Sequence, residues 1–302
     1  MSVRIPNVFH FVFGLRPQTR AFHLVHYLCL ESCRQVCRPD RIRFYYQYEP
    51  HGRYWDLIRD HVDLVKVDPA PVVGEFRYRD PGIAKFAYAH HADFIRLEKL
   101  AEQGGVYADM DTLFINSIPV ALFEKSFVLG RENDVVVQET GETRRSLCNA
   151  FIMAEPGSEF CRLWLARLKD SFDGSWSNHS TLLPQVLSEE RPELIHIEPP
   201  RTFYKHMWTP KGIHALLLGD DPDNEGVVSF HLWSHLWWSR RRTDFSRAHG
   251  GMFTEKFIRT RNTTYNRVAR RFLPPPRPRS DIAGRVRDWV GNVFAGGGAW
   301  MA

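Results

Sequence analysis

Short apolar runs alternate with helical segments along the first third of the chain, and this alternation limits the possible folds more than any other feature. We expect strands at residues 5–13, 42–48, 62–67 and 106–108, separated by helices at residues 21–36, 54–61 and 83–103. Later elements are expected as strands at 127–129, 150–154, 194–197 and 227–233 and helices at 159–169 and 181–187. Strands that alternate with helices build an open sheet of parallel strands with helices on its faces. The pattern therefore predicts an α/β fold.

The composition is that of a folded globular protein. Hydrophobic residues make up 43% of the 302 residues and charged residues 25%, which excludes the disordered, collagen-like and coiled-coil classes. No apolar run approaches the roughly 18 residues of a membrane span. The apolar residues after Arg4 are interrupted by Asn7 and His10, so they predict a core strand rather than a secretory signal. We therefore expect a cytoplasmic protein.

The positive charge is concentrated towards the C-terminus. Residues 240–280 contain twelve Lys or Arg and two acidic residues, whereas the whole chain has a net charge of +5. We expect one domain over residues 1–238 and a basic extension over residues 239–302, with a Pro- and Arg-rich linker and a short tail. The basic band could contact lipid headgroups on the inner face of a membrane, nucleotide phosphates or an acidic acceptor, or it could be a solvated helical face. The rest of the chain is mildly acidic, so nucleic acid is not an expected partner.

Three of the five cysteines recur at every fourth position. Cys29, Cys33 and Cys37 therefore lie along one face of the predicted helix. Their spacing is not one of the usual metal-ligand spacings, so a buried stripe of small residues is the favoured interpretation over a metal cluster. Without a secretory signal, a disulfide scaffold is not expected.

Two carboxylates directly follow the strand predicted at 106–108. They belong to an Asp-Met-Asp motif at residues 109–111, and a Gly-Gly pair at 104–105 ends the preceding helix. Carboxylates at a strand end can share a divalent cation that neutralises a diphosphate leaving group. The D-x-D pattern alone means little, because a chain of this length contains about one by chance. A second copy at residues 221–223 lies among turn-forming residues and is interpreted as a turn.

The residues around the first D-x-D are more specific. Residues 92–100 read Ala-Asp-Phe-Ile-Arg-Leu-Glu-Lys-Leu, and residues 104–111 read Gly-Gly-Val-Tyr-Ala-Asp-Met-Asp. This block resembles the sugar-binding D-x-D region of glycosyltransferase family 32 and its relatives, which include the glucosylating domains of large clostridial toxins and the yeast outer-chain mannosyltransferase. Weaker similarity covers residues 5–10, 148–154 and 231–237.

The resemblance implies a single Rossmann-type, GT-A-like nucleotide-sugar-binding domain with helical additions. It implies a retaining transfer that depends on Mn²⁺ or Mg²⁺, from a UDP- or GDP-sugar to a saccharide or glycolipid acceptor, in surface polysaccharide synthesis. By position, the residues implied in donor binding are Phe11, Val12, Phe13, Asp93, Arg96, Tyr107, Asp109, Asn149 and Trp237. The implied metal or phosphate ligands are Asp111, Asp109 and His231. No carboxylate is assigned as a catalytic nucleophile.

Several of these residues also have a simpler structural interpretation. Asp93 and Arg96 are spaced i, i+3 and could form an ion pair on a helix surface. Tyr107 could be an aromatic residue of the core. His231 and His235 could be packed histidines, or could bind zinc from a helix, although the β-like residues before them argue against a helix.

Two other functions are retained as alternatives. Residues 109–112 also resemble the nucleophile loop of haloacid-dehalogenase-like phosphatases, in which Asp109 would be phosphorylated and Asp111 would act as the acid and base. In those phosphatases the loop follows a longer apolar strand than the one predicted here at 106–108, after the Gly-Gly pair. The phosphatase interpretation also leaves the pattern at residues 92–96 unexplained. The second alternative is a non-catalytic sugar-binding scaffold, against which the intact carboxylate pair argues.

Overall fold

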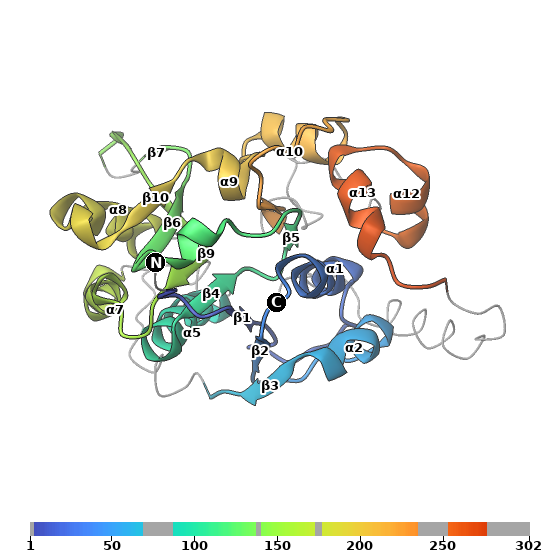
Figure 1. The fold of residues 1–302 in the computed structure, drawn as a ribbon, viewed down its shortest axis with the longest axis horizontal. Helices are drawn as coiled ribbons and strands as arrows, with labels where there is room; N and C mark the ends of the chain where they lie inside the picture. Colours follow the sequence, from blue (N-terminus) through green and yellow to red (C-terminus); the bar gives the residue numbers. More distant parts are fainter. Residues whose placement is uncertain (1–2, 69–86, 137–139, 173–176, 235–252, 277–302) are drawn as a thin grey trace.

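The computed structural model describes residues 3–68, 87–136, 140–172, 177–234 and 253–276. Within them, the chain forms a seven-stranded sheet with the strand order β10-β6-β9-β4-β1-β2-β3 and with helices on both faces (Figure 1). Its strands are β1 (Val8–Val12), β2 (Arg41–Tyr46), β3 (Asp63–Lys66), β4 (Gly105–Ala108), β6 (Phe127–Arg131), β9 (Leu147–Ala154) and β10 (His196–Glu198). Two small sheets pair β5 (Thr112–Phe114) with β11 (Ser229–His231) and β7 (Val135–Val136) with β8 (Thr143–Arg144).

Helices of eight or more residues cover the sheet. They are α1 (Leu24–Ser32), α5 (Ala87–Gln103), α7 (Glu159–Ser171), α8 (Leu183–Glu190) and α10 (Pro210–Leu217). Shorter helices are α2 (Arg53–Ile58), α6 (Val120–Phe123), α9 (Pro200–Tyr204), α12 (Glu255–Thr260) and α13 (Thr264–Ala269), and π-helical turns span Cys33–Cys37 and Asn178–Leu182. The predicted α/β fold is confirmed. Among the described helices, none combines the length and the apolar character needed to cross a membrane.

The predicted elements correspond closely to the observed ones in the first half of the chain. The strands predicted at 5–13, 42–48 and 62–67 are β1, β2 and β3, and the helix predicted at 83–103 is α5 from Ala87 onward. Residues 83–86 lie outside the described part. The helix predicted at 181–187 begins at Leu183, after a π-helical turn. Strands β5, β7 and β8 and the short helices α9, α12 and α13 were not predicted, because each is too short to show a periodic pattern.

Strand β9 departs from the predicted parallel arrangement. β1 is parallel to β2 and β4, β2 is parallel to β3, and β6 is parallel to β10. β9 is antiparallel to both of its neighbours, β4 and β6. The chain passes from β6 to β9 through the β7–β8 hairpin and not through a crossover helix, so these neighbouring strands reverse direction. The apolar residues of β9 contain no information about this direction.

The chain changes sides of the sheet at β1. It builds β2 and β3 on one side and then returns through α5 to place β4 on the other. In open α/β sheets, ligands bind outside the carboxyl ends of the strands at such a switch point. The motif at residues 109–111 follows β4 directly, so the topology brings its carboxylates to this position.

Two hydrophobic clusters pack against the opposite faces of the sheet. Successive side chains of a strand point to opposite faces. Accordingly, Phe9 and Phe11 of β1 belong to the cluster that includes α1 and α2, whereas Val12 belongs to the cluster that includes α5 and α7. Ile258 of α12 and Tyr265 of α13 are buried in the first cluster, so residues 253–276 share the core of the sheet.

The basic C-terminal region is attached to the sheet by polar contacts as well. Arg267 of α13 pairs with Asp220 at 2.7 Å, and Glu255 of α12 pairs with Arg53 of α2. The predicted division of the chain at residue 238 stays a prediction. The linker beyond residue 276 and the tail lie outside the described residues.

The structure also settles the two minor motifs. The cysteines of the predicted stripe are free, with Cys29 and Cys33 buried and Cys37 half-buried. The candidate metal group found among the described residues contains none of them. Residues 221–223 form a loop in which the Asp221 side chain accepts a hydrogen bond from the Asp223 backbone N–H at 3.0 Å, as expected of a turn.

Gly105 determines how closely β1 and β4 approach. Its φ of +112° is in the region that favours glycine, and it begins β4 directly after the end of α5. A Cβ atom at this position would collide with the carbonyl oxygen of Val8 and would lie 2.7 Å from Nε2 of His10. A side chain here would therefore push β4, and the carboxylates after it, away from β1.

We expect Gly105→Ala to lower the free energy of unfolding by about 2–4 kcal/mol, because backbone strain and overpacking act together. The matched control is Gly157→Ala. Gly157 also has a positive φ of +71°, but a Cβ there would meet nothing within 4 Å. Strain alone should cost the control about 1 kcal/mol. Urea unfolding measures both values, and equal losses would contradict this account of Gly105.

Candidate active site

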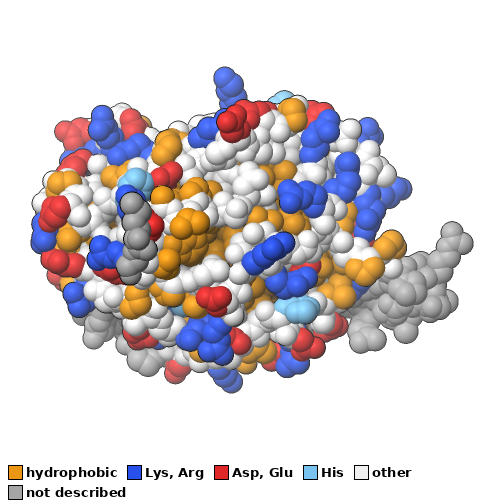
Figure 2. Space-filling view, in the orientation of Figure 1, with side chains coloured by type: hydrophobic (Ala, Val, Ile, Leu, Met, Phe, Trp, Pro, Cys, Tyr) orange, Lys and Arg blue, Asp and Glu red, His pale blue; other side chains and the backbone are white. Residues whose placement is uncertain are grey.

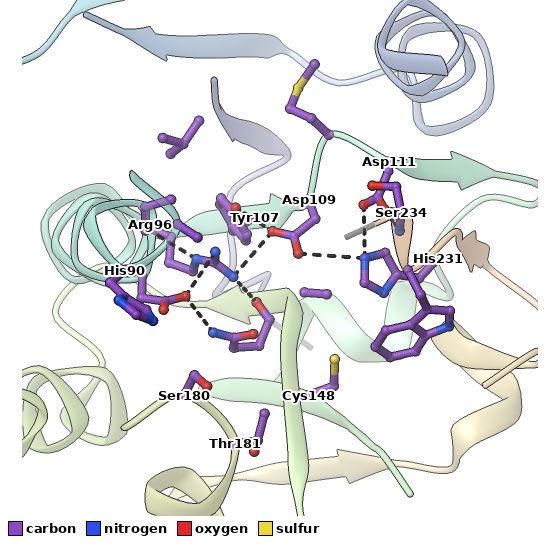
Figure 3. Close-up of a pocket in the computed structure, with 18 of the residues that line it drawn as sticks. His90, Arg96, Tyr107, Asp109, Asp111, Cys148, Ser180, Thr181, His231 and Ser234 are labelled. Carbon is purple, nitrogen blue, oxygen red and sulfur yellow. Dashed lines mark hydrogen bonds and ion pairs between the residues drawn. The ribbon is translucent and has the colours of Figure 1, made fainter. Parts of the chain in front are cut away.

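A cavity of about 330 Å³ opens at the carboxyl edge of the sheet (Figure 3). This volume is within the roughly 300–1,000 Å³ of small-molecule sites. Its walls come from the end of β1, the first half of α5, the turn after β4, the start of β9 and the loop after β11. The cavity therefore lies at the switch point of the sheet.

Arg96 is buried at the centre of a hydrogen-bonded network on one side of this cavity (Figure 3). Its Nη2 lies 3.0 Å from Oδ1 of Asp93, one turn earlier on α5. Its Nη1 donates to the carbonyl oxygen of Asn149 on β9 at 2.7 Å and lies 3.3 Å from Oδ1 of Asp109. The guanidinium also stacks 4.3 Å from the ring centre of Tyr107. One side chain thus joins α5, β4 and β9.

Asp93 is held in its charged form. Its Oδ1 accepts a hydrogen bond from Nδ2 of Asn149 at 2.8 Å, and its Oδ2 lies 2.9 Å from Nε2 of His179. Burial by itself raises the pKa of Asp93, but Arg96 and His179 outweigh burial and hold that pKa below its ordinary value. The side chains of Arg96 and Asp93 are only 7% and 10% exposed, so they form a buried ion pair and not a surface one.

Asp109, Asp111 and His231 form a group of candidate metal ligands among the described residues. One ligand atom from each lies within 4.8 Å of the other two. Nε2 of His231 is 2.9 Å from Oδ1 of Asp111 and 3.7 Å from Oδ2 of Asp109 (Figure 3). Carboxylate oxygens suit Mg²⁺ and Mn²⁺, and imidazole nitrogen is accepted by transition metals. These side chains therefore fit a divalent cation.

The charges of Asp109, Asp111 and His231 influence one another, and a bound cation could take the place of the positive charge on His231. Burial raises the pKa of Asp109, and Arg96 and His231 offset this only in part. Burial also acts on Asp111, but His231 and the backbone N–H of Ser234 hold the pKa of Asp111 well below its ordinary value. Burial lowers the pKa of His231, yet the two aspartates raise it above its ordinary value. The carboxylates therefore favour the protonated form of His231, and a bound cation would compete with that proton.

Trp233 positions a backbone donor for Asp111. Its φ of +53° is unusual for a residue with a large side chain. Its indole donates to the carbonyl oxygen of His206 at 2.9 Å, and its ring centre lies 4.2 Å from that of His231. The strained backbone places the N–H of Ser234 2.8 Å from Oδ2 of Asp111. Such strain persists where the surrounding structure enforces it, and this happens most often at functional sites.

Glu132 is a fourth acidic group in the cavity wall, beside Asp93, Asp109 and Asp111, and it was not predicted from the sequence. It follows β6 directly, and burial raises the pKa of Glu132 to about 7. Glu132 lies three residues beyond the strand predicted at 127–129, so that prediction did not point to it. His179 and Trp208 were missed as well, because no pattern was recognised in their segments. Trp233 and Ser234 lie within the weakly similar stretch 231–237, but neither was assigned a role.

The predicted donor-binding residues are divided between the cavity and the core. Val12 and Phe13 line the cavity. Phe11 does not, because it packs in the core with its ring centre 6.4 Å from that of Phe114. Tyr107 is buried as a core aromatic residue, but its hydroxyl donates to Oδ1 of Asp109 at 2.6 Å. Residues 235–252, which include the predicted Trp237, lie outside the described part of the chain.

Comparison with known proteins identifies the block that contains this site. Residues 37–133 match the family model described as a glycosyltransferase sugar-binding region containing a DXD motif. This block of the chain is similar to the DXD glycosyltransferases. A relative named Glucan organizing enzyme 1, from Cryptococcus neoformans var. grubii serotype A, is 28% identical over 278 residues, which cover 90% of this chain and 71% of that protein. The predicted resemblance and the predicted enzyme class, a glycosyltransferase, are thereby confirmed.

Solved structures with a distant likeness are also glycosyltransferases. The galactosyltransferase LgtC, solved with donor and acceptor sugar analogues, is 15% identical with a TM-score of 0.48, and the likeness covers 92% of this chain and 99% of that one. The PaToxG glycosyltransferase is 15% identical with a TM-score of 0.42, covering 62% of this chain and 70% of that one. Likenesses this distant show nothing about the donor or acceptor of this chain.

We expect Arg96→Met to lower the free energy of unfolding by about 3–5 kcal/mol, because it leaves two carboxylates buried without their cation. The matched control is Arg4→Met. Arg4 pairs with Glu155 at 2.6 Å, but its side chain is 51% exposed, and exposed pairs contribute at most about 1 kcal/mol. Chemical denaturation measures both variants. A loss at Arg96 no larger than the loss at Arg4 would show that the network does not stabilise the fold.

Proposed function

We propose that this protein transfers a sugar from a nucleoside diphosphate sugar to a saccharide or glycolipid acceptor, with a divalent cation at Asp109, Asp111 and His231. The observation that carries the proposal is the double role of Asp109. Its Oδ1 lies 3.3 Å from Arg96 in the buried network, and its Oδ2 lies 3.7 Å from His231 in the ligand group. A sugar diphosphate needs both environments side by side, since its sugar carries hydroxyls and its diphosphate carries negative charge.

A cation held by these three side chains would neutralise the charge that develops on the diphosphate as it leaves. Mn²⁺ or Mg²⁺ would serve. The donor set of two carboxylates and one imidazole supports such a site, and the two aspartates raise the pKa of His231 as a nearby negative charge should.

Other residues that line the cavity would bind and orient the donor. Asp93 presents carboxylate oxygen atoms to sugar hydroxyls, and Asn149 presents its side-chain amide. Arg96 holds both residues in place. Val12 and Phe13 supply an apolar wall at the end of β1, where the uracil or guanine of a UDP- or GDP-sugar would pack. Pre-organised groups of this kind lower the barrier because they do not have to reorient during the reaction.

Retention of configuration at the anomeric carbon is proposed on the family resemblance. A role in surface polysaccharide synthesis is proposed on the same ground, and the name of the relative, Glucan organizing enzyme 1, supports a polysaccharide setting. The phosphatase alternative is disfavoured. Oδ1 of Asp109 is engaged by Tyr107 and Arg96, and the family match covers the D-x-D block itself.

The basic C-terminal band is proposed as a contact for an anionic membrane surface on the cytoplasmic side. Figure 2 shows Lys and Arg side chains gathered over the region of α12 and α13. Lys256, Arg261 and Arg271 are exposed there, and none of them makes an ion pair within the described part of the chain. Basic residues near a surface favour anionic lipid by about 1 kcal/mol each.

Co-sedimentation with phosphatidylglycerol vesicles tests this contact. The double variant Lys256→Glu/Arg261→Glu should lose most of the binding at low salt, because the attraction is electrostatic. Lys66→Glu/Arg162→Glu changes the charge equally at exposed positions of β3 and α7 and should bind as the wild type does. Equal binding by both double variants would contradict a membrane role for this band.

The donor site is tested by thermal unfolding with MnCl₂ and a panel of UDP- and GDP-sugars. A ligand at about 100 times its Kd stabilises the native state by about 2.7 kcal/mol, which corresponds to a rise in Tm of several degrees. We expect such a rise with one nucleotide sugar, only when Mn²⁺ or Mg²⁺ is present, and its loss in Asp111→Asn. The control Asp223→Asn removes a carboxylate from the second D-x-D and should keep the rise.

The alternatives give different results in the same experiment. A metal-dependent rise in Tm without turnover to any acceptor would favour a sugar-binding scaffold. Hydrolysis of sugar phosphates or acyl phosphates without any response to nucleotide sugars would favour a phosphatase and would overturn the transferase.

A further inference from the structure

Glu132 is a carboxylate of the cavity wall that the donor site does not use. It follows β6, and its backbone N–H donates to the carbonyl oxygen of Ser146 at 3.2 Å. No ion pair joins its side chain to Lys, Arg or His among the residues that the structure describes. An acidic side chain in a partly buried position is usually paired with a cation. Glu132 has no such ion pair, so its carboxylate is available to a ligand in the cavity.

The neighbours of Glu132 come from a different part of the fold than the Arg96 network. Its carboxylate interacts with Cys148 at the start of β9 and with Trp208 in the turn before α10. It also raises the pKa of Tyr204 on α9 and of His231 on β11. None of these elements is α5, so the cavity has a second polar wall apart from the one that Asp93 and Arg96 form.

Two buried hydrogen-bonding atoms on this second wall have no well-formed hydrogen bond. The indole Nε1 of Trp208 lies close enough to the Glu132 carboxylate to lower the pKa of that carboxyl, but it makes no hydrogen bond of ordinary geometry among the described residues, and neither does the imidazole Nδ1 of His231. Both side chains line the cavity. Leaving such an atom buried and unpaired costs about 1–3 kcal/mol, so these atoms are suited to a polar ligand that enters the cavity.

We propose that Glu132 and Trp208 form the acceptor subsite, which binds one sugar ring of a saccharide acceptor. The Glu132 carboxylate accepts a hydrogen bond from an acceptor hydroxyl, and the Trp208 N–H donates to an acceptor oxygen. The indole ring packs against the apolar face of the sugar. This assignment rests on the proposed function, because it requires that the opposite wall holds the donor.

Charge distinguishes the two ligands. A nucleoside diphosphate is anionic, and a carboxylate without a cation repels it. An acceptor hydroxyl is neutral and donates a hydrogen bond, which makes an unpaired carboxylate a good acceptor for it. Glu132 therefore suits the acceptor, whereas Asp109 and Asp111 suit the diphosphate through a shared cation.

The test uses the full chain with Mn²⁺ and separates acceptor binding from donor binding. An array of immobilised saccharides is first probed with the wild-type protein loaded with Mn²⁺ and UDP or GDP, and a retained saccharide becomes the probe. The variant Glu132→Gln should weaken binding of that saccharide, and raise its KM, by about tenfold or more, since it replaces a hydrogen bond to a charged group. Trp208→Phe, which keeps a ring but removes the N–H, should weaken it several-fold.

A control variant and the expected stability of Glu132→Gln show that lost saccharide binding would not have another cause. Glu124→Gln changes a partly buried glutamate at the end of α6, which does not line the cavity, and should behave as the wild type. The pKa of Glu132 is raised to about 7 in the native state, so its ionisation opposes folding as the pH rises from the unfolded pKa through 7. Glu132→Gln should therefore be at least as stable as the wild type at pH 8, and lost binding would not reflect unfolding.

The outcomes separate the two proposals. The subsite is supported if Glu132→Gln weakens the saccharide while its Kd for the nucleotide sugar stays within about twofold. It is overturned if the variant weakens the nucleotide sugar as much as the saccharide, if saccharide binding does not change, or if the wild type retains no saccharide. If Mn²⁺ and nucleotide sugars fail to bind the wild type, the proposed function itself fails.

Discussion

The buried guanidinium of Arg96 is the constraint on which the site depends. A buried cation is tolerated only when its hydrogen bonds and its charge are both satisfied. Asp93 from its own helix, the Asn149 carbonyl from β9 and Asp109 after β4 meet this requirement together. Any shift of α5 against the sheet would break several of these contacts at once. The sugar-binding groups are therefore positioned by the same interaction that aligns the helix with the two strands.

Asp109 connects this network to the ligand group. One of its oxygens faces Arg96 and Tyr107, and the other faces His231. Its neighbour Asp111 is held independently, by His231 and by the N–H that the strained backbone of Trp233 presents. The two aspartates of one short motif thus belong to different environments. That difference gives Asp109 a raised pKa and Asp111 a lowered one.

The cavity has two polar walls that differ in their chemistry. In the first wall, Arg96 pairs with carboxylates, and the polar groups are already hydrogen-bonded to one another. The other, around Glu132 and Trp208, has an acidic group that makes no ion pair among the described residues and a buried indole N–H without a hydrogen bond of ordinary geometry. Two ligands of different charge would find separate places in such a cavity. The switch point of the sheet brings both walls together, since β4, β9 and β6 are neighbours.

Local sequence determined the strands and helices up to residue 111, because their periodicity and the Gly-Gly stop depend on neighbouring residues alone. The same block supplied Asp93, Arg96, Asp109 and Asp111, whose spacing follows one helix and one strand end. Tertiary structure decided the rest. It reversed β9, since an apolar run does not encode direction, and it placed Phe11 in the core, since the two faces of a buried strand look alike in sequence. It also brought His179 to Asp93 and Glu132 to the cavity from distant segments, because contacts across a fold depend on packing and leave no pattern along the chain.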